Sequence, residues 1–228
     1  MNEILWFVML VVNFVAIMLA FRLWGKLGLF IWIPMSVIIA NIQVTKTVML
    51  FGLEATLGNI VYATSFLATD ILSEWYGKKE AAKAVAIGFF SLVVATIVMN
   101  IALVFTPAPS DHVHSSMITI FSLLPRITVA SLVAYAVSQT HDIYAFEYWK
   151  KRKPHSSYLW LRNNASTMIS QLIDTLLFTL IAFWGYFPLN VLFQIMITTY
   201  VLKWVVALCD TPFIYLARKW VEQGVIVD

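Results

Sequence analysis

Three ionisable side chains stand in the middle of long apolar runs of this sequence. Asp70, Asp174 and Lys203 each have mostly hydrophobic residues on both sides. A charged side chain within hydrocarbon is costly, so such residues usually face a protein interior or a water-filled cavity and mark the pathway of a substrate or ion. These positions are the first candidates for chemistry in the chain.

Helical spacing gathers further polar and aromatic residues on the same faces. Residues three, four or seven apart lie on one side of a helix. The stripes formed in this way are Asn59, Tyr62, Phe66, Asp70 and Ser73; Tyr135, Gln139 and Asp142; Asn164, Thr167, Gln171, Asp174 and Phe178; and Lys203 with Asp210. Several helices that present carboxylates, amides and rings near mid-membrane are typical of a transporter site.

Other roles are open for some of these residues. Asp174 and Lys203 could form a purely structural ion pair, and Lys46 and Arg126 could extend to the outer headgroups. Asn13 and Asn100 are expected to hydrogen-bond between helices rather than to bind a ligand.

The composition excludes a soluble globular protein. Of 228 residues, 61% are hydrophobic and 12% are charged, too few polar residues to cover a core. The single cysteine, Cys209, excludes an intrachain disulfide. No catalytic motif or metal-ligand spacing is present, so we expect no enzyme activity, no cofactor, no metal and no nucleic-acid partner.

The elements that must position the stripes are membrane-spanning helices. About 20 apolar residues cross a bilayer core, and the alternation of a barrel strand is absent. The sequence therefore predicts an all-α polytopic membrane helical bundle, with residues 1–228 forming a single transmembrane domain. The seven predicted segments are residues 4–21, 28–51, 56–75, 83–105, 125–147, 163–185 and 190–217.

Loop charges predict the orientation of this bundle. Lysine and arginine concentrate after the first, third, fifth and seventh segments, whereas the intervening connections hold almost none. The positive-inside rule makes the basic loops cytoplasmic, which places the N-terminus outside and the C-terminus inside. The basic residues are Arg22, Lys26, Lys78, Lys79, Lys83, Lys150, Lys151, Arg152, Lys153, Arg162, Arg218 and Lys219.

Two prolines and one short stretch bear on the shape of the helices. Pro125 suits the first turn of the fifth helix, where its missing N–H costs nothing. Residues 115–124 are then expected to form a short interfacial or re-entrant helix, or else part of one kinked long helix. Pro212 is expected to bend or end the seventh helix near its inner end.

Four sequence blocks carry a resemblance to a known family. They are ANIQVTKTV, which includes Asn41; FLATDILSEWYGKKEA (66–81); RITVASLVAYAVSQTHD (126–142); and LRNNASTMISQLIDTLLFTLIAFWG (161–185). In this order they resemble the queuosine precursor transporter family, also described as a vitamin-uptake-like group of inner-membrane proteins. The resemblance covers residues 28–218. This chain differs from the shorter six-helix members in having an additional first helix.

The resemblance implies import of a 7-deazapurine, such as the cyano or aminomethyl queuosine precursor or queuine, for tRNA modification salvage. A carboxylate could accept the adjacent N–H groups of such a base in a two-point contact. Under this hypothesis Asp70 or Asp174 binds that donor edge, Tyr62 or Phe66 stacks on the ring, and Lys203 balances a buried carboxylate. The remaining polar contacts would come from Asn41, Gln139, Asn164 and Gln171.

The expected partners are a purine-like small molecule and the lipid bilayer of the cell membrane. The buried carboxylates would also permit a coupling ion, proton or sodium. A homodimer is a further possible assembly. Two rival functions remain. The chain could be the substrate-binding subunit of an energy-coupling-factor uptake system, or a membrane receptor or assembly protein without flux.

Overall fold

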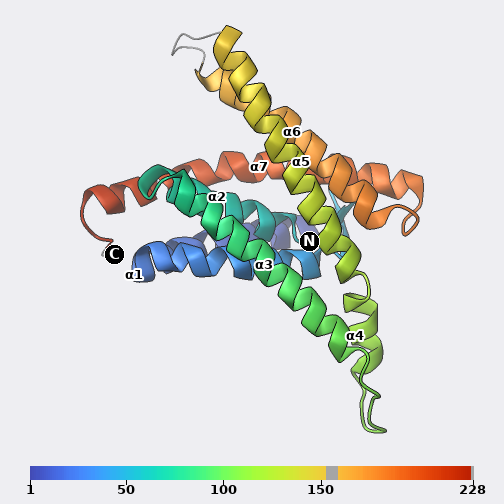
Figure 1. The fold of residues 1–228 in the computed structure, drawn as a ribbon. Coiled ribbons are helices and arrows are strands. Elements are labelled where there is room, and N and C mark those ends of the chain that lie inside the picture. Colours follow the sequence, from blue (N-terminus) through green and yellow to red (C-terminus); the bar gives the residue numbers. More distant parts are fainter. Residues whose placement is uncertain (153–158, 227–228) are drawn as a thin grey trace. The chain divides into compact units, whose positions relative to one another are not determined.

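The computed structural model describes residues 1–152 and 159–226 of the chain (Figure 1). Side chains at 139–140, 142–143, 145–147, 149–152, 159–167 and 211 lie outside the description. Helices make up most of the described chain, and every predicted segment overlaps one of them. The elements are α1 (Asn2–Gln43), β1 (Thr47–Leu50), β2 (Leu53–Thr56), α2 (Asn59–Trp75), α3 (Lys78–Ala102), α4 (His114–Phe121), α5 (Leu124–Arg152), α6 (Leu159–Phe183) and α7 (Leu189–Glu222).

The described helices include four that are long and apolar enough to cross a membrane. Their ranges are Asn2–Gln43, Lys78–Ala102, His114–Ser138 and Leu189–Glu222, and Met168–Phe183 forms a shorter apolar helix. These helices fit an all-α membrane bundle. The number of crossings and their direction stay predictions.

The chain divides into two compact units, which are described separately. Unit 1 contains Met1–Pro125 and Val201–Asp228, and unit 2 contains Arg126–Tyr200. Helix α7 therefore contributes its first part to unit 2 and its remainder to unit 1.

Helix α1 is two helical halves joined at a sharp break. Gly25 has φ 50° and ψ −133°, a conformation that only glycine adopts readily. The chain reverses there, and the two halves lie alongside each other (Figure 1). The two halves approach closely at Gly28, where a Cβ atom would lie 2.1 Å from the carbonyl oxygen of Ala20. The two halves correspond to the first two predicted segments.

The end of the second predicted segment, 28–51, was wrong. The helix ends at Gln43, and residues 47–56 form an antiparallel hairpin in which Val48 pairs with Ala55. Its two turn residues both have positive φ, 52° at Phe51 and 80° at Gly52. Such a turn matches the twist of two paired strands. An apolar composition concealed this change from helix to strand.

The hairpin is attached to the start of α1. Asn2 Nδ2 donates a hydrogen bond to the Met49 carbonyl at 3.0 Å, and the Phe51 N–H donates to Glu3 Oε1 at 3.1 Å. The first residues of the chain and the 47–56 hairpin therefore lie at the same end of unit 1.

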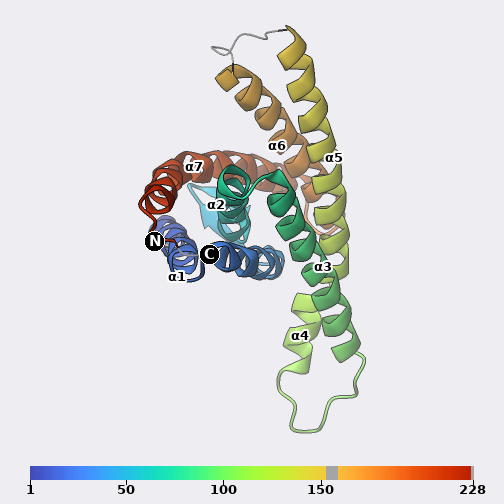
Figure 2. The ribbon, with the colours of Figure 1, turned by 60° about the vertical axis from the view of Figure 1, so that its left-hand side comes forward.

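Helices α1, α2 and α3 pack against one another in unit 1 (Figure 2). The largest fully buried side chains of their core include Phe21, Leu29, Leu67 and Leu92. The stacked rings of Phe14 and Phe213, 4.5 Å apart, add the end of α7 to this core. Pro212 does not end α7, which continues to Glu222.

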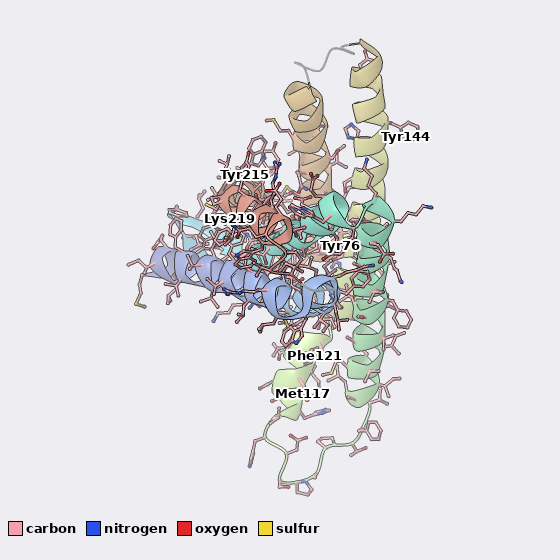
Figure 3. The ribbon with its side chains drawn as sticks, turned by 90° about the vertical axis from the view of Figure 1, so that its left-hand side faces the viewer. Tyr76, Met117, Phe121, Tyr144, Tyr215 and Lys219 are labelled. Carbon is pink, nitrogen blue, oxygen red and sulfur yellow. The ribbon has the colours of Figure 1, made fainter. Side chains whose placement is uncertain are left out.

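The opposite end of unit 1 gathers basic residues from three connections. Lys26 Nζ lies 2.6 Å from Glu80 Oε2 and 5.6 Å from the centroid of the Tyr76 ring, which Figure 3 shows at the end of α2. Arg22 lies 5.5 Å from the centroid of the Trp220 ring on α7. This shared end supports the prediction that the basic loops lie on one side of a membrane.

Residues 115–121 form most of the short helix α4, and two residues separate it from the start of α5. Asn100 near the end of α3 donates a hydrogen bond to the Phe121 carbonyl at 3.4 Å. In the preceding loop, Asp111 Oδ1 accepts the N–H groups of Val113 at 2.7 Å and His114 at 3.0 Å. These two hydrogen bonds hold the pKa of Asp111 below its ordinary value.

Unit 2 contains α6, nearly all of α5 and the first part of α7. Arg126 closes the end of α6, because its Nε donates to the Ile181 carbonyl and its Nη2 to the Trp184 carbonyl, each at 2.6 Å. Those carbonyls have no helical partner of their own. Arg126, for which a headgroup contact was one alternative, thus caps a helix end.

Candidate functional site

The stripe on α2 meets α7 at an aromatic and cationic group in unit 1. The rings of Tyr62 and Phe66 lie 5.4 Å apart at 86°, edge to face. Lys203 Nζ on α7 lies 5.8 Å from the centroid of the Tyr62 ring, and Lys203 is only 9% exposed. The spacing of the two rings followed from the sequence. The contact of Tyr62 with Lys203 depends on how α2 and α7 pack.

This Tyr62–Phe66–Lys203 group can bind a flat, electron-rich ligand. An aromatic side chain offers its face to a planar heterocycle, and an ammonium within about 6 Å of a ring centroid is attracted to the ring. Burial of Lys203 strengthens the electrostatic attraction because the surroundings have a low dielectric constant. Of the predicted site residues, these three are the ones that the structure brings together in unit 1.

Two carboxylates of unit 1 lie further along the same helices. Asp70 shares the stripe of Tyr62 and Phe66 on α2, and its side chain is exposed. Asp210 on α7 is 8% exposed and is close enough to Asp70 for their charges to interact. The α2–α7 contact therefore combines rings, a cation and carboxylates.

Asn41, also a predicted site residue, is held within its own helix. Its Nδ2 donates a hydrogen bond to the Val37 carbonyl at 2.7 Å, and the residue is buried. One donor of this amide is therefore engaged in the second half of α1.

In unit 2, two polar pairs connect α5 with α6. Ser138 Oγ donates a hydrogen bond to Asp174 Oδ1 at 3.5 Å, and His141 Nδ1 shares one with Ser170 Oγ at 3.0 Å. Asp174 and Ser170 are both buried. The structure thus places Asp174 within hydrogen-bonding distance of one hydroxyl group, that of Ser138, on the neighbouring helix.

His141 and Ser170 are further candidates that the sequence analysis did not name. Ser170 lies four residues before Asp174 on α6, and His141 lies three residues after Ser138 on α5. Residues at this spacing share a helix face, so the position of Asp174 was a signal for Ser170. Gln171 lies next to this group in sequence, and its buried Oε1 has no hydrogen-bond partner among the described residues. The side chains of Gln139 and Asn164 lie outside the described residues.

The described part of the chain contains no group of three histidine, cysteine or acidic side chains that could hold a metal ion. The candidate site residues are instead hydrogen-bonding and aromatic groups, a combination suited to an organic ligand.

Comparison with known proteins assigns the family. The family model "Putative vitamin uptake transporter" matches residues 56–217, which begin after α1. A "Probable queuosine precursor transporter" from Bacillus subtilis (strain 168) is 45% identical over 97% of both chains. The "Queuosine precursor transporter" of Escherichia coli (strain K12) is 28% identical over 64% of this chain and 62% of its own length.

A "Probable queuosine precursor transporter" from Haemophilus influenzae (strain ATCC 51907 / DSM 11121 / KW20 / Rd) is 27% identical over 59% of this chain and 54% of its own length. No solved structure shows a significant match to the chain. The full-length similarity and the matching family model agree with the apolar helices. The chain belongs to the queuosine precursor transporter family of multi-pass membrane transporters.

Proposed function

We propose that this chain imports a queuosine precursor, a 7-deazapurine base such as the cyano or aminomethyl precursor or queuine, for tRNA modification salvage. The observation that carries the proposal is the 45% identity to a probable queuosine precursor transporter over 97% of both chains. Similarity along nearly the whole of two chains of equal extent favours the same cargo class. The chain then acts in the cell membrane as a carrier and not as an enzyme.

The proposed topology has seven transmembrane segments, with the N-terminus outside and the C-terminus inside. The distribution of lysine and arginine among the loops supports it. The contacts of Lys26 with Glu80 and of Arg22 with Trp220 agree, because they join three basic connections at one end of unit 1. The break at Gly25 then lies on the cytoplasmic side.

In the proposed site, Tyr62 or Phe66 stacks on the base, and Asp70 or Asp174 accepts hydrogen bonds from its N–H groups. The aromatic and cationic group on α2 and α7 supports the stacking role, because the Tyr62 ring contacts both the Phe66 ring and Lys203. Lys203 balances the negative charge of a carboxylate. Asn41, Gln139, Asn164 and Gln171 complete the polar contacts.

Selectivity in this site comes from the cost of unpaired polar groups. A dry pocket that pairs every N–H and C=O of a guanine-like base leaves groups unsatisfied when another base enters. A coupling ion, proton or sodium, would act at the carboxylates, and imposed gradients of each ion would identify it. The proposal includes a homodimer as an alternative to a monomeric carrier.

A cellular salvage assay tests the proposal. Cells that can neither synthesise nor import the precursor receive this chain, and queuosine in their tRNA is measured with and without each 7-deazapurine in the medium. We expect modification to depend on both the chain and the added base. Modified tRNA that appears equally without the chain, or never appears with it, would contradict the proposal.

A further inference from the structure

Asn59, the first residue of α2, has a buried amide that the proposed site does not use. Its Nδ2 and Oδ1 are both enclosed and without a hydrogen-bond partner, and the residue is 7% exposed. Among the described residues it is the one amide in which the nitrogen and the oxygen both lack a partner. Such a group costs stability and calls for an explanation.

A second unpaired amide lies at the end of α1, which the start of α2 approaches closely. Gln43 is the last residue of α1, and its Oε1 is also enclosed without a partner. Gly58, with φ 91°, brings the start of α2 against the end of α1: a Cβ there would lie 2.4 Å from the Ala40 carbonyl oxygen and 3.1 Å from the Val44 nitrogen. Gly58 and Val44 approach each other closely, and in the sequence Asn59 follows Gly58 and Gln43 precedes Val44.

The free hydrogen-bonding groups of these two amides complement one edge of a guanine-like base. That edge presents an acceptor, its carbonyl, followed by two donors, a ring N–H and an amino group. Asn59 offers a donor beside an acceptor, and Gln43 offers a further acceptor. A positively charged ligand edge has no counter-charge in these two side chains, so an uncharged ligand fits them better.

The position of Asn59 on α2 connects it with the stacking residue. Asn59 and Tyr62 are three residues apart on one stripe, about 4.5 Å along the helix axis, whereas Asp70 is about 12 Å from Tyr62 on the same scale. A base stacked on Tyr62 therefore meets Asn59 before Asp70. Phe66, four residues from Asp70, would serve the inner carboxylate in the same way.

We propose that Gln43 and Asn59 form an outer binding subsite that reads the acceptor–donor–donor edge of a 7-deazaguanine stacked on Tyr62. The base occupies this subsite before it moves along α2 to Phe66 and Asp70. The inference rests on the proposed function, because it assigns recognition residues for the same cargo.

Binding to the purified full-length protein tests the subsite with two ligands, 7-deazaguanine and the analogue that lacks the 2-amino group, 7-deazahypoxanthine. Asn59→Leu should weaken binding of both about tenfold or more, because one partner of a two-point contact is lost. Gln43→Leu should remove the preference of the wild-type protein for the ligand with the amino group.

Thermal unfolding without ligand supplies the matched control. Asn13 is buried like Asn59, but its Nδ2 donates to the Met9 carbonyl at 2.7 Å. Asn59→Leu should raise Tm by about 2 °C, because it removes an unpaired polar group from the interior, whereas Asn13→Leu should lower Tm. If Asn59→Leu does not fold, Asn59→Asp replaces the donor with an acceptor and should also weaken both ligands.

The outcomes separate the subsite from the cargo. A wild-type protein that binds neither 7-deazapurine overturns both proposals. If the wild-type protein binds a 7-deazapurine and Asn59→Leu and Asn59→Asp change its affinity by less than twofold, the outer subsite alone is overturned. A fall of Tm in Asn59→Leu as large as that in Asn13→Leu also overturns it, because the amide would then have a structural partner such as an enclosed water.

Discussion

Unit 1 and unit 2 hold their candidate site residues by different interactions. In unit 1, Tyr62 contacts Phe66 and Lys203 through its ring, at 5.4 and 5.8 Å. In unit 2, Asp174 accepts a hydrogen bond from Ser138, and a second pair joins the same helices. Unit 1 thus joins its candidate residues through ring contacts, whereas unit 2 joins them through hydrogen bonds that orient a carboxylate.

The comparison suggests a division of work within the proposed carrier. Unit 1 offers the surface that stacks on a base, together with the unpaired amides of Gln43 and Asn59. Unit 2 offers a buried carboxylate whose orientation is held by a neighbouring hydroxyl. Substitutions in the two units should therefore differ in size and in ligand dependence.

The largest effect is expected from the carboxylates. Asp174→Asn and Asp70→Asn, made separately, should reduce uptake of the precursor about tenfold to a hundredfold where the carboxylate binds the base, because a hydrogen bond to a charged group is lost. Precursor-dependent queuosine in tRNA measures this. Undiminished uptake in both variants would end the carboxylate proposal for both units.

A smaller effect is expected from the aromatic surface of unit 1. Tyr62→Leu should weaken binding of a 7-deazapurine about tenfold through loss of stacking, and Tyr62→Phe should retain most of it. Tyr144→Leu on α5 is the matched control, because Tyr144 is 70% exposed (Figure 3). Equal losses in Tyr62→Leu and Tyr144→Leu would show that stacking on Tyr62 does not contribute.

Removal of a hydroxyl in unit 2 should act more weakly. Ser138→Ala removes a long hydrogen bond to Asp174, 3.5 Å, and should reduce uptake about threefold, because the Asp174 side chain is kept but is less well oriented. Thr119→Ala, at an exposed residue of α4, provides the background value. A loss as large as that of Asp174→Asn would mean that orientation, rather than charge, is the role of the pair.

The smallest effect is expected outside both regions, at Asp111. Its pKa is lowered by the N–H groups of Val113 and His114, so its stabilising contribution is present above the ordinary value of 3.8 and is lost as the pH falls through the lower folded value. Asp111→Ala should speed hydrogen exchange of those two amides near pH 7 and leave ligand binding unchanged. Weakened ligand binding in this variant would show that α4 takes part in the site.

Much of the fold followed from the sequence because membrane helices are specified locally. Each of the seven predicted apolar segments overlaps a helix, and Pro125 marked the start of α5. The 47–56 hairpin was missed because its residues are as apolar as a spanning helix. Gly52 and Gly58, together with the β-branched Thr47 and Val48, were the available signals for a turn and strands.

Only part of the candidate site could be predicted from the sequence. The Tyr62–Phe66 contact could be predicted because a single helix fixes the spacing of four residues. The contact of Lys203 with Tyr62 and the His141–Ser170 pair join different helices, so they depend on packing that no local pattern encodes. Gln43 was missed because an amide at the end of a helix has no periodic signature.

Uptake by the purified protein in liposomes tests the central claim most directly. Vesicles that contain only this chain should accumulate a labelled 7-deazapurine when a proton or sodium gradient is imposed, and Tyr62→Leu should reduce the rate. Binding without accumulation under either gradient would contradict a self-sufficient carrier. It would favour a substrate-binding subunit that needs partner proteins, or a receptor.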